Sequence, residues 1–366
     1  MDANLTYTDP LRNHSLIPLI HYSGSYKIVG TVSLGIILTV GFIGNILVML
    51  VLTLSPKLHT PTNCYLVSLS ASDLLVLMTS TTLMLQEFYQ PYNHWTLGNF
   101  ACQLSVCLQY LSVDASALSI CAFSVERWVG ICYPMRAHYM CTIKRAIKII
   151  AGIWIFTLIY NLPWIFMSTT IRQHSEYGTY EKCTFAFKRT AYKAIYMFDL
   201  ILFYVIPLLI TAVMYCQISW RLFRTDDIKG SISSVVGRQQ ININRRTVAS
   251  GNPQHSYATN ATTTAIMNES QQNLKLRKVI NRVRARRQVV KLLMTIVVLF
   301  ASFWLPYRSM VVYNSFSLNG YHDLWFRMFS RIMAYLNSAV NPILYNAMSR
   351  KFRRALKRML KCQKVI

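Results

Sequence analysis

One aspartate lies in the middle of a long apolar segment, where an ionised carboxylate is unfavourable unless it has partners. Asp73 follows Ser72 and precedes the apolar pair Leu74 and Leu75. An acid in such a place is a candidate functional residue. Other apolar segments carry amide and hydroxyl groups at a similar depth: Asn45, Ser116, Asn337, Ser338 and Asn341. This set suits a small cation such as sodium, or a proton; a purely structural polar network is the alternative.

An acid and a base stand side by side at the end of another apolar segment. Glu126 and Arg127 are followed by Trp128. The guanidinium of arginine stays charged in proteins, so Arg127 must pair with Glu126 or reach water. A pair that breaks when helices move acts as a switch, whereas a fixed anchor at a membrane surface is the alternative reading.

Two prolines inside apolar segments have bulky or polar neighbours. Trp304 lies two residues before Pro306, and Asn341, Pro342 and Tyr345 form a second group. Proline removes a helical hydrogen bond and bends the helix, so such helices can pivot. We therefore expect both groups to belong to the same switch as Arg127.

A further set of polar side chains is predicted to line a pocket between helices. Tyr110 and Asp114 are four residues apart and so share one face of a helix. Asp199 and Arg308 carry opposite charges, and they either contact a ligand or neutralise one another. With Tyr307 and Arg331, these residues predict a pocket suited to a small polar peptide rather than a lipid.

Cysteine spacing and hydrolase motifs argue against an enzyme. The chain has 9 cysteines but no CxxC pair and no Cys/His cluster at metal spacing, so we expect no zinc site. Neither a GxSxG nor an HExxH motif occurs. Cys102 and Cys183 are the cysteines best placed in an oxidising space, and we predict a disulfide between them.

The segments that position these residues are long enough to cross a bilayer as helices. The 366 residues are 53% hydrophobic and 14% charged, against roughly 25% charged in soluble proteins. A helix crosses with about 20 apolar residues, and the lack of alternation argues against barrel strands. We predict an all-α bundle of seven transmembrane helices, at 27–54, 63–89, 99–133, 143–167, 190–223, 286–315 and 323–346.

The net charge of +25 would indicate nucleic-acid binding in a soluble protein. Here the lysines and arginines gather in loops and in the tail, so membrane topology explains them and no nucleic-acid partner is expected. The bias places the N-terminus outside the plasma membrane, although the loop after the fourth span is also basic. We expect an extracellular segment at 1–26, a transmembrane domain at 27–347 with a disordered cytoplasmic loop at 225–273, and a helix with a tail at 348–366.

Modification sites follow from this topology. Asn4 and Asn13 head sequons on the outer side and are predicted to be glycosylated. After the last span, apolar residues share one helical face and basic residues the other, which predicts a short amphipathic helix on anionic membrane lipid. Cys362 follows it as a candidate palmitoylation site, with an unmodified thiol as the alternative.

These motifs occur in the order and spacing of one family. Over residues 27–361 the chain resembles the rhodopsin-like receptors, and the resemblance rests on these positions: Asn45, Asp73, Cys102, the Glu126–Trp128 tripeptide, Trp154, Pro207, Trp304 with Pro306, and Asn341-Pro342 with Tyr345. Glu126 and Trp128 stand where the family usually has aspartate and tyrosine. The resemblance implies a receptor that activates a heterotrimeric G protein through this switch. Tyr335 in place of the retinal lysine and Gln109 in place of the amine-binding aspartate exclude two ligand classes.

A closer resemblance is to thyrotropin-releasing hormone receptors, on residues 60–69, 108–111, 304–308, 311–316 and 335–339. It implies a short amidated peptide as ligand and signalling through Gq, phospholipase C and calcium. In that family, the tyrosine that matches Tyr110 contacts the pyroglutamyl end of the peptide. The residues that match Tyr307 on the sixth span and Arg331 on the seventh contact the rest, and the arginine contacts the C-terminal prolinamide. Asp114 stands where the family has asparagine, which favours a free amine at the peptide's other end.

The remaining expectations concern partners and rival classes. After residue 349 the tail has no serine or threonine, so phosphorylation-dependent arrestin binding would use the loop at 225–273. A receptor for a different short peptide is the first alternative. A transporter would show internal repeats and a channel a filter-like sequence, and neither is visible.

Overall fold

The computed structural model describes residues 21–175, 178–187, 189–221, 290–291, 294–317, 321, 323–348 and 350–361. Asn4, Asn13, the loop at 225–273 and Cys362 lie outside the described residues, so the expectations on them stay predictions.

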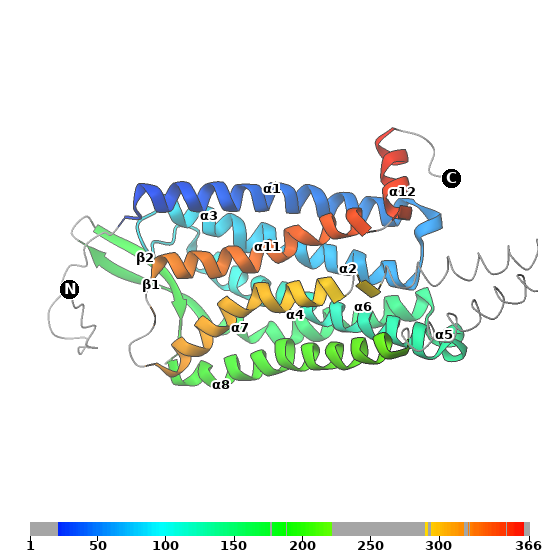
Figure 1. The fold of residues 1–366 in the computed structure, drawn as a ribbon. Coiled ribbons are helices and arrows are strands. Elements are labelled where there is room, and N and C mark those ends of the chain that lie inside the picture. The colour runs from blue at the N-terminus through cyan, green and yellow to red at the C-terminus, as the bar shows by residue number, and fades with distance from the viewer. Residues whose placement is uncertain are drawn as a thin grey trace, which may run out of the picture.

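Long helices lie side by side in one bundle (Figure 1). Helices α1, α2, α4, α6 and α8 span Gly24–Leu54, Pro61–Val76, Gly98–Cys132, Ile143–Asn161 and Arg189–Leu200. Helices α3 and α7, at Thr82–Tyr89 and Pro163–Met167, extend α2 and α6. Six of the described helices are long and apolar enough to cross a membrane, the last at Met294–Phe316. Helix α11, Leu324–Met348, follows these six in sequence and packs along α1 and α2.

Side-chain caps set where several helices begin. Oγ of Ser23 accepts from the amide of Tyr26, and Thr60 caps α2 in the same way just before Pro61. These groups satisfy amides that have no partner inside the helix. Both helices therefore begin two or three residues earlier than the hydrophobic pattern predicted.

Helix α4 lies at the centre of the bundle. In the most apolar 18 residues of α4, 61% of the residues are buried, against 17% in the corresponding stretch of the Ile143–Met167 span, because α4 packs against α2, α6 and α7. Helix α1 approaches its neighbours closely at Gly41, where an added Cβ would lie 2.7 Å from Leu77 and 3.3 Å from the Cα of Ala339. The opposite face of α1 exposes a row of apolar side chains, as lipid contact requires: Ile28, Val32, Ile36, Val40 and Ile43.

Several departures from regular helix interrupt the spans. The π-helical turn η2, Leu77–Thr81, separates α2 from α3, and η3, Ile201–Val205, lies just before Pro207. Such turns commonly accompany functional sites in membrane helices. Pro342 lies inside α11, as expected. Prolines in the sequence predict departures from regular helix, whereas the turn at Leu77–Thr81 contains no proline and was not predicted.

A β-hairpin caps one end of the bundle, which we call the hairpin end. Strands β1, Ser168–Ser175, and β2, Gly178–Phe185, pair antiparallel, with Thr170 opposite Cys183. Gly178 has φ +121°, a conformation that favours glycine at the turn. The all-α prediction did not include this hairpin.

The short helices η1, Pro56–Leu58, α5, Pro134–Met140, and α12, Arg350–Leu360, lie at the opposite end, which we call the α12 end (Figure 1). Phe352 is buried, and Ala355, Leu356 and Met359 pack against the bundle, while Lys357 and Arg358 are exposed. The predicted amphipathic helix after the last span is confirmed.

Candidate functional site

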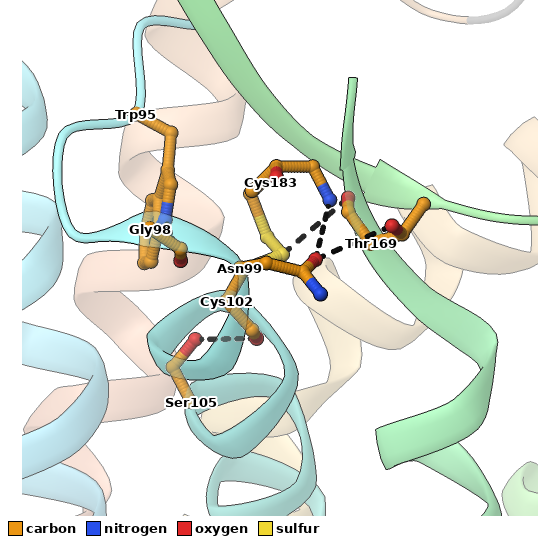
Figure 2. The surroundings of a disulfide bond; sticks show 8 residues. Trp95, Gly98, Asn99, Cys102, Ser105, Thr169 and Cys183 are labelled. Atoms are coloured by element: carbon orange, nitrogen blue, oxygen red, sulfur yellow. Dashed lines mark hydrogen bonds between the residues drawn. A yellow bond between two sulfur atoms is a disulfide. The ribbon is translucent and has the colours of Figure 1, made fainter. Parts of the chain in front are cut away.

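A disulfide fixes the hairpin above the bundle. Cys102 at the start of α4 and Cys183 on β2 are bonded, with Cα atoms 5.7 Å apart, so this prediction is confirmed. Figure 2 shows Asn99 beside the bond, and its Oδ1 accepts from the amide of Thr170 at 2.9 Å and from Oγ1 of Thr169 at 3.3 Å. The hairpin is therefore tied to α4 through both of its strands.

A polar cavity of about 280 Å³ lies beneath this hairpin. Its walls come from α3, α4, β2, the Met294–Phe316 helix and α11, so it sits where the bundle opens at the hairpin end. Hydrogen-bonding side chains dominate its lining, among them Gln86, Glu87, Gln109, Tyr307, Arg331 and Tyr335. Of the residues predicted to bind ligand, Tyr307 and Arg331 line this cavity.

An ion pair crosses the cavity wall. Nη1 of Arg331 donates to Oε2 of Glu87 at 3.0 Å, and the hydroxyl of Tyr22 donates to Oε1 at 2.7 Å. Both charged side chains are 30% exposed, so each still faces the cavity. Glu87 was not predicted as a ligand residue, although an acid in this apolar segment is a candidate functional residue for the same reason as Asp73.

The other four predicted ligand residues are not among those that line this cavity, and Asp114, Asp199 and Arg308 are buried. Tyr110 stacks on Trp164, with ring centroids 4.4 Å apart and planes 8° apart. Asp114 is completely buried, and its Oδ2 accepts from Nδ2 of Asn161 at 2.8 Å. Asn161 was not singled out from the sequence, because its partner is 47 residues away.

Asp199 and Arg308 pair with each other, which was the predicted alternative to contacts with a ligand. Nη1 of Arg308 donates to Oδ2 of Asp199, and the two side chains are 8% and 0% exposed. Asp114 interacts electrostatically with both partners. This region therefore holds two acids and one base, and within the described chain Oδ1 of Asp114 has no hydrogen-bond partner.

Asp73 is buried and contacts one of the polar groups that were predicted to surround it. Its Oδ2 accepts from Nδ2 of Asn341 at 2.8 Å, and Nδ2 of Asn45 donates to the carbonyl of Ser338 at 3.0 Å. Ser116 and Asn337 are buried as well, and the Ser116 hydroxyl has no partner among the described residues. Oxygen donors of this kind fit a small hard cation, so the site is compatible with sodium.

The predicted switch residues lie deeper in the bundle and toward the α12 end. Arg127 and Glu126 form a loose pair, with Nη2 and Oε1 3.9 Å apart. Nε1 of Trp128 donates to Oε1 of Gln217 at 2.6 Å, a link to the Tyr192–Arg221 helix that the sequence did not reveal. Trp304 and Tyr345 are buried, and Nε1 of Trp304 and the hydroxyl of Tyr345 lack partners within the described part of the chain.

Comparison with known proteins agrees with this architecture. The profile of the 7 transmembrane receptor (rhodopsin family) matches residues 44–345. The chain belongs to this family, and it is therefore a multi-pass membrane receptor and not an enzyme.

Its relatives include thyrotropin-releasing hormone receptors and neuromedin-U receptors. The thyrotropin-releasing hormone receptor of Gallus gallus is 36% identical over 341 residues, covering 93% of this chain and 80% of that protein. The human receptor of that name is 35% identical over 338 residues, covering 92% and 79%. The neuromedin-U receptor 2 of Rattus norvegicus is 29% identical over 340 residues, covering 90% and 74%.

Proposed function

We propose that this chain is a plasma-membrane receptor for a short amidated peptide that resembles thyrotropin-releasing hormone. Binding of the peptide activates a heterotrimeric G protein of the Gq type, and through it phospholipase C and calcium release. The observation that carries the proposal is the polar cavity under the disulfide-tethered hairpin, with Tyr307, Arg331 and Glu87 in its wall. The similarity to thyrotropin-releasing hormone receptors supports the ligand class.

The size of the cavity favours a short ligand. Ligand pockets usually hold about 300–1,000 Å³, and this one, at about 280 Å³, lies just below that range. It accommodates one end of a small peptide rather than a folded hormone. Amide, phenol and guanidinium groups line it, and these are the groups that bind peptide carbonyls and amides.

The cavity is connected to the switch through two helices. Tyr307 lies three residues after Trp304, with ring centroids 6.0 Å apart and Pro306 between them in sequence. Arg331 lies on α11, which also carries Asn341, Pro342 and Tyr345. A ligand that contacts Tyr307 and Arg331 differently in two arrangements of these helices shifts the equilibrium between them.

The proposal includes the topology expected from the charge bias. The hairpin end faces the extracellular space, with Asn4 and Asn13 glycosylated, and the α12 end faces the cytoplasm. There Glu126 and Arg127 meet the G protein, the loop at 225–273 recruits arrestin, and α12 lies on membrane lipid with Cys362 acylated. Sodium at Asp73, Ser116, Asn337 and Asn341 stabilises the resting arrangement, since a cation there compensates the buried carboxylate.

A calcium-release screen tests the function. Cells expressing the receptor are challenged with short amidated peptides, among them a pyroglutamyl tripeptide ending in prolinamide, and with neuromedin-U. Untransfected cells and cells expressing Arg127→Ala at equal surface density are the controls. The proposal expects a response to at least one short amidated peptide that the Arg127 variant lacks. If no peptide causes calcium release, the proposal is contradicted. If only neuromedin-U does, the receptor function stands and the ligand belongs to a different peptide class.

A further inference from the structure

The two charged side chains in the cavity wall neutralise each other. Glu87 and Arg331 are the acid and the base among the residues that line it, and the other lining groups are uncharged when His94 is neutral. A cavity with no net charge does not attract an ion as such. It favours a neutral group that has a hydrogen-bond acceptor facing Arg331 and, beside it, a donor facing Glu87.

Both side chains have hydrogen-bonding capacity left over. A guanidinium has five N–H donors, and the one described bond of Arg331 uses Nη1 toward Glu87. An ionised carboxylate accepts about four hydrogen bonds, and Glu87 accepts one from Arg331 and one from Tyr22. Each can therefore bind a ligand atom without breaking the ion pair.

We propose that Glu87 and Arg331 together bind the primary carboxamide at the C-terminus of the peptide. The carbonyl oxygen of the amide accepts from the guanidinium, and its NH₂ group donates to the carboxylate. This inference rests on the proposed function and adds a specificity residue to it. A free C-terminal carboxylate finds the same arginine but meets the negative charge of Glu87, so Glu87 selects amidated peptides over their free acids.

The position of Glu87 is fixed from a third side, as a selective contact requires. Tyr22, just before α1, donates to Oε1 and stacks on Tyr26 with ring centroids 4.9 Å apart. Tyr26 and Tyr22 also pack edge-on against Phe88, the residue after Glu87. The carboxylate is thus held between the segment that precedes α1 and helix α11, in the lining of the cavity.

A cycle of peptide and receptor variants tests the proposal. The pyroglutamyl tripeptide amide, its free acid and its dimethylamide are compared on the native receptor and on Glu87→Gln by calcium response at equal surface expression. Glu181→Gln, which removes the same charge from a half-buried side chain on strand β2, is the matched control. Tyr22→Phe keeps both charges of the ion pair and removes one hydrogen bond to Glu87.

The native receptor should prefer the amide over both analogues by about ten- to a hundredfold, the range expected for one hydrogen bond to a charged group. Glu87→Gln should weaken the amide and strengthen the free acid, so that the preference between them collapses. The preference should survive in Glu181→Gln and, somewhat reduced, in Tyr22→Phe. An equal loss for all three peptides in Glu87→Gln would mean that Glu87 only positions Arg331, and the proposal would be overturned.

A binding measurement separates this inference from the proposed function. Thermal unfolding of the purified receptor is followed with millimolar N-acetylprolinamide or N-acetylproline. Stabilisation by the amide alone, lost in Glu87→Gln, supports the carboxamide site even if no peptide activates the receptor. Activation by amide and acid forms alike, with equal stabilisation by both probes, leaves the receptor function standing and overturns the carboxamide site.

Discussion

Nη1 of Arg331 lies 3.0 Å from Oε2 of Glu87, an ion pair between α11 and α3 whose partners are 244 residues apart in sequence. The pair holds the guanidinium against the cavity at the hairpin end. Arg331 is therefore oriented before any ligand arrives, and a ligand that contacts it also lies close to the negative charge of Glu87.

Replacing Arg331 should weaken the response to the agonist peptide more than it weakens the fold. Loss of one charge-assisted hydrogen bond costs about 1.5–3 kcal/mol, so Arg331→Ala should raise the half-maximal agonist concentration by roughly tenfold to a few hundredfold. Calcium dose–response curves at matched surface expression measure this. Arg172→Ala, which removes an exposed side chain from strand β1, is the control, and equal curves for the two variants would exclude Arg331 from the ligand site.

The buried pair Asp199–Arg308 should act mainly on stability. Removing one partner leaves an uncompensated buried charge, which costs about 3–5 kcal/mol. Arg308→Met should therefore unfold at a markedly lower temperature, and the double variant with Asp199→Asn should recover much of the loss. A single variant that keeps its thermal stability but loses agonist response would instead make Arg308 a ligand contact.

Asp114→Asn distinguishes a ligand contact from a structural acid. The substitution removes the charge, keeps the shape and leaves an oxygen for Asn161. If Asp114 pairs with a ligand amine, the variant should respond less to peptides with a free N-terminal amine and more to pyroglutamyl peptides. Equal changes for both peptide types would assign Asp114 to the buried cluster of Asp199 and Arg308.

The spans and the residues within them could be predicted because burial in lipid leaves a strong, local signature. The sequence predicts the fourth span at 143–167, and the structure has Ile143–Met167. It also predicts a seventh at 323–346, where the structure has helix α11, Leu324–Met348, although this segment carries Arg327 and Arg331. The bond between Cys102 and Cys183 followed from their shared side of the membrane.

The contacts between distant helices could not be predicted in this way. Glu87 with Arg331, Asp114 with Asn161, and Trp128 with Gln217 each join helices whose rotation about their own axes no single segment determines. The hairpin of β1 and β2 also lacked a clear signal. Its strands lie in a polar stretch of sequence. They are held against α4 by the disulfide and by Asn99, contacts whose two partners lie far apart in sequence.

The α12 end should open on activation. The Met294–Phe316 helix should pivot about Pro306 and move away from α4. The Glu126–Arg127 pair within α4, whose atoms are 3.9 Å apart, is too long for a strong hydrogen bond and should separate as this end opens. Spin labels at Tyr133→Cys and Met294→Cys, in a background with the exposed Cys216 replaced by serine, measure the distance. It should increase with agonist, and a constant distance in a receptor that still signals would contradict the switch.

Nucleotide exchange on purified Gq, with the receptor alone in lipid nanodiscs, tests the central claim most directly. The account predicts that a short amidated peptide accelerates exchange of guanine nucleotide, that its free acid does so at least about tenfold less potently, and that Arg127→Ala abolishes the effect. If exchange stays at the basal rate with every short amidated peptide, while the same receptor preparation is folded and carries the Cys102–Cys183 bond, this chain is not the amidated-peptide receptor proposed here.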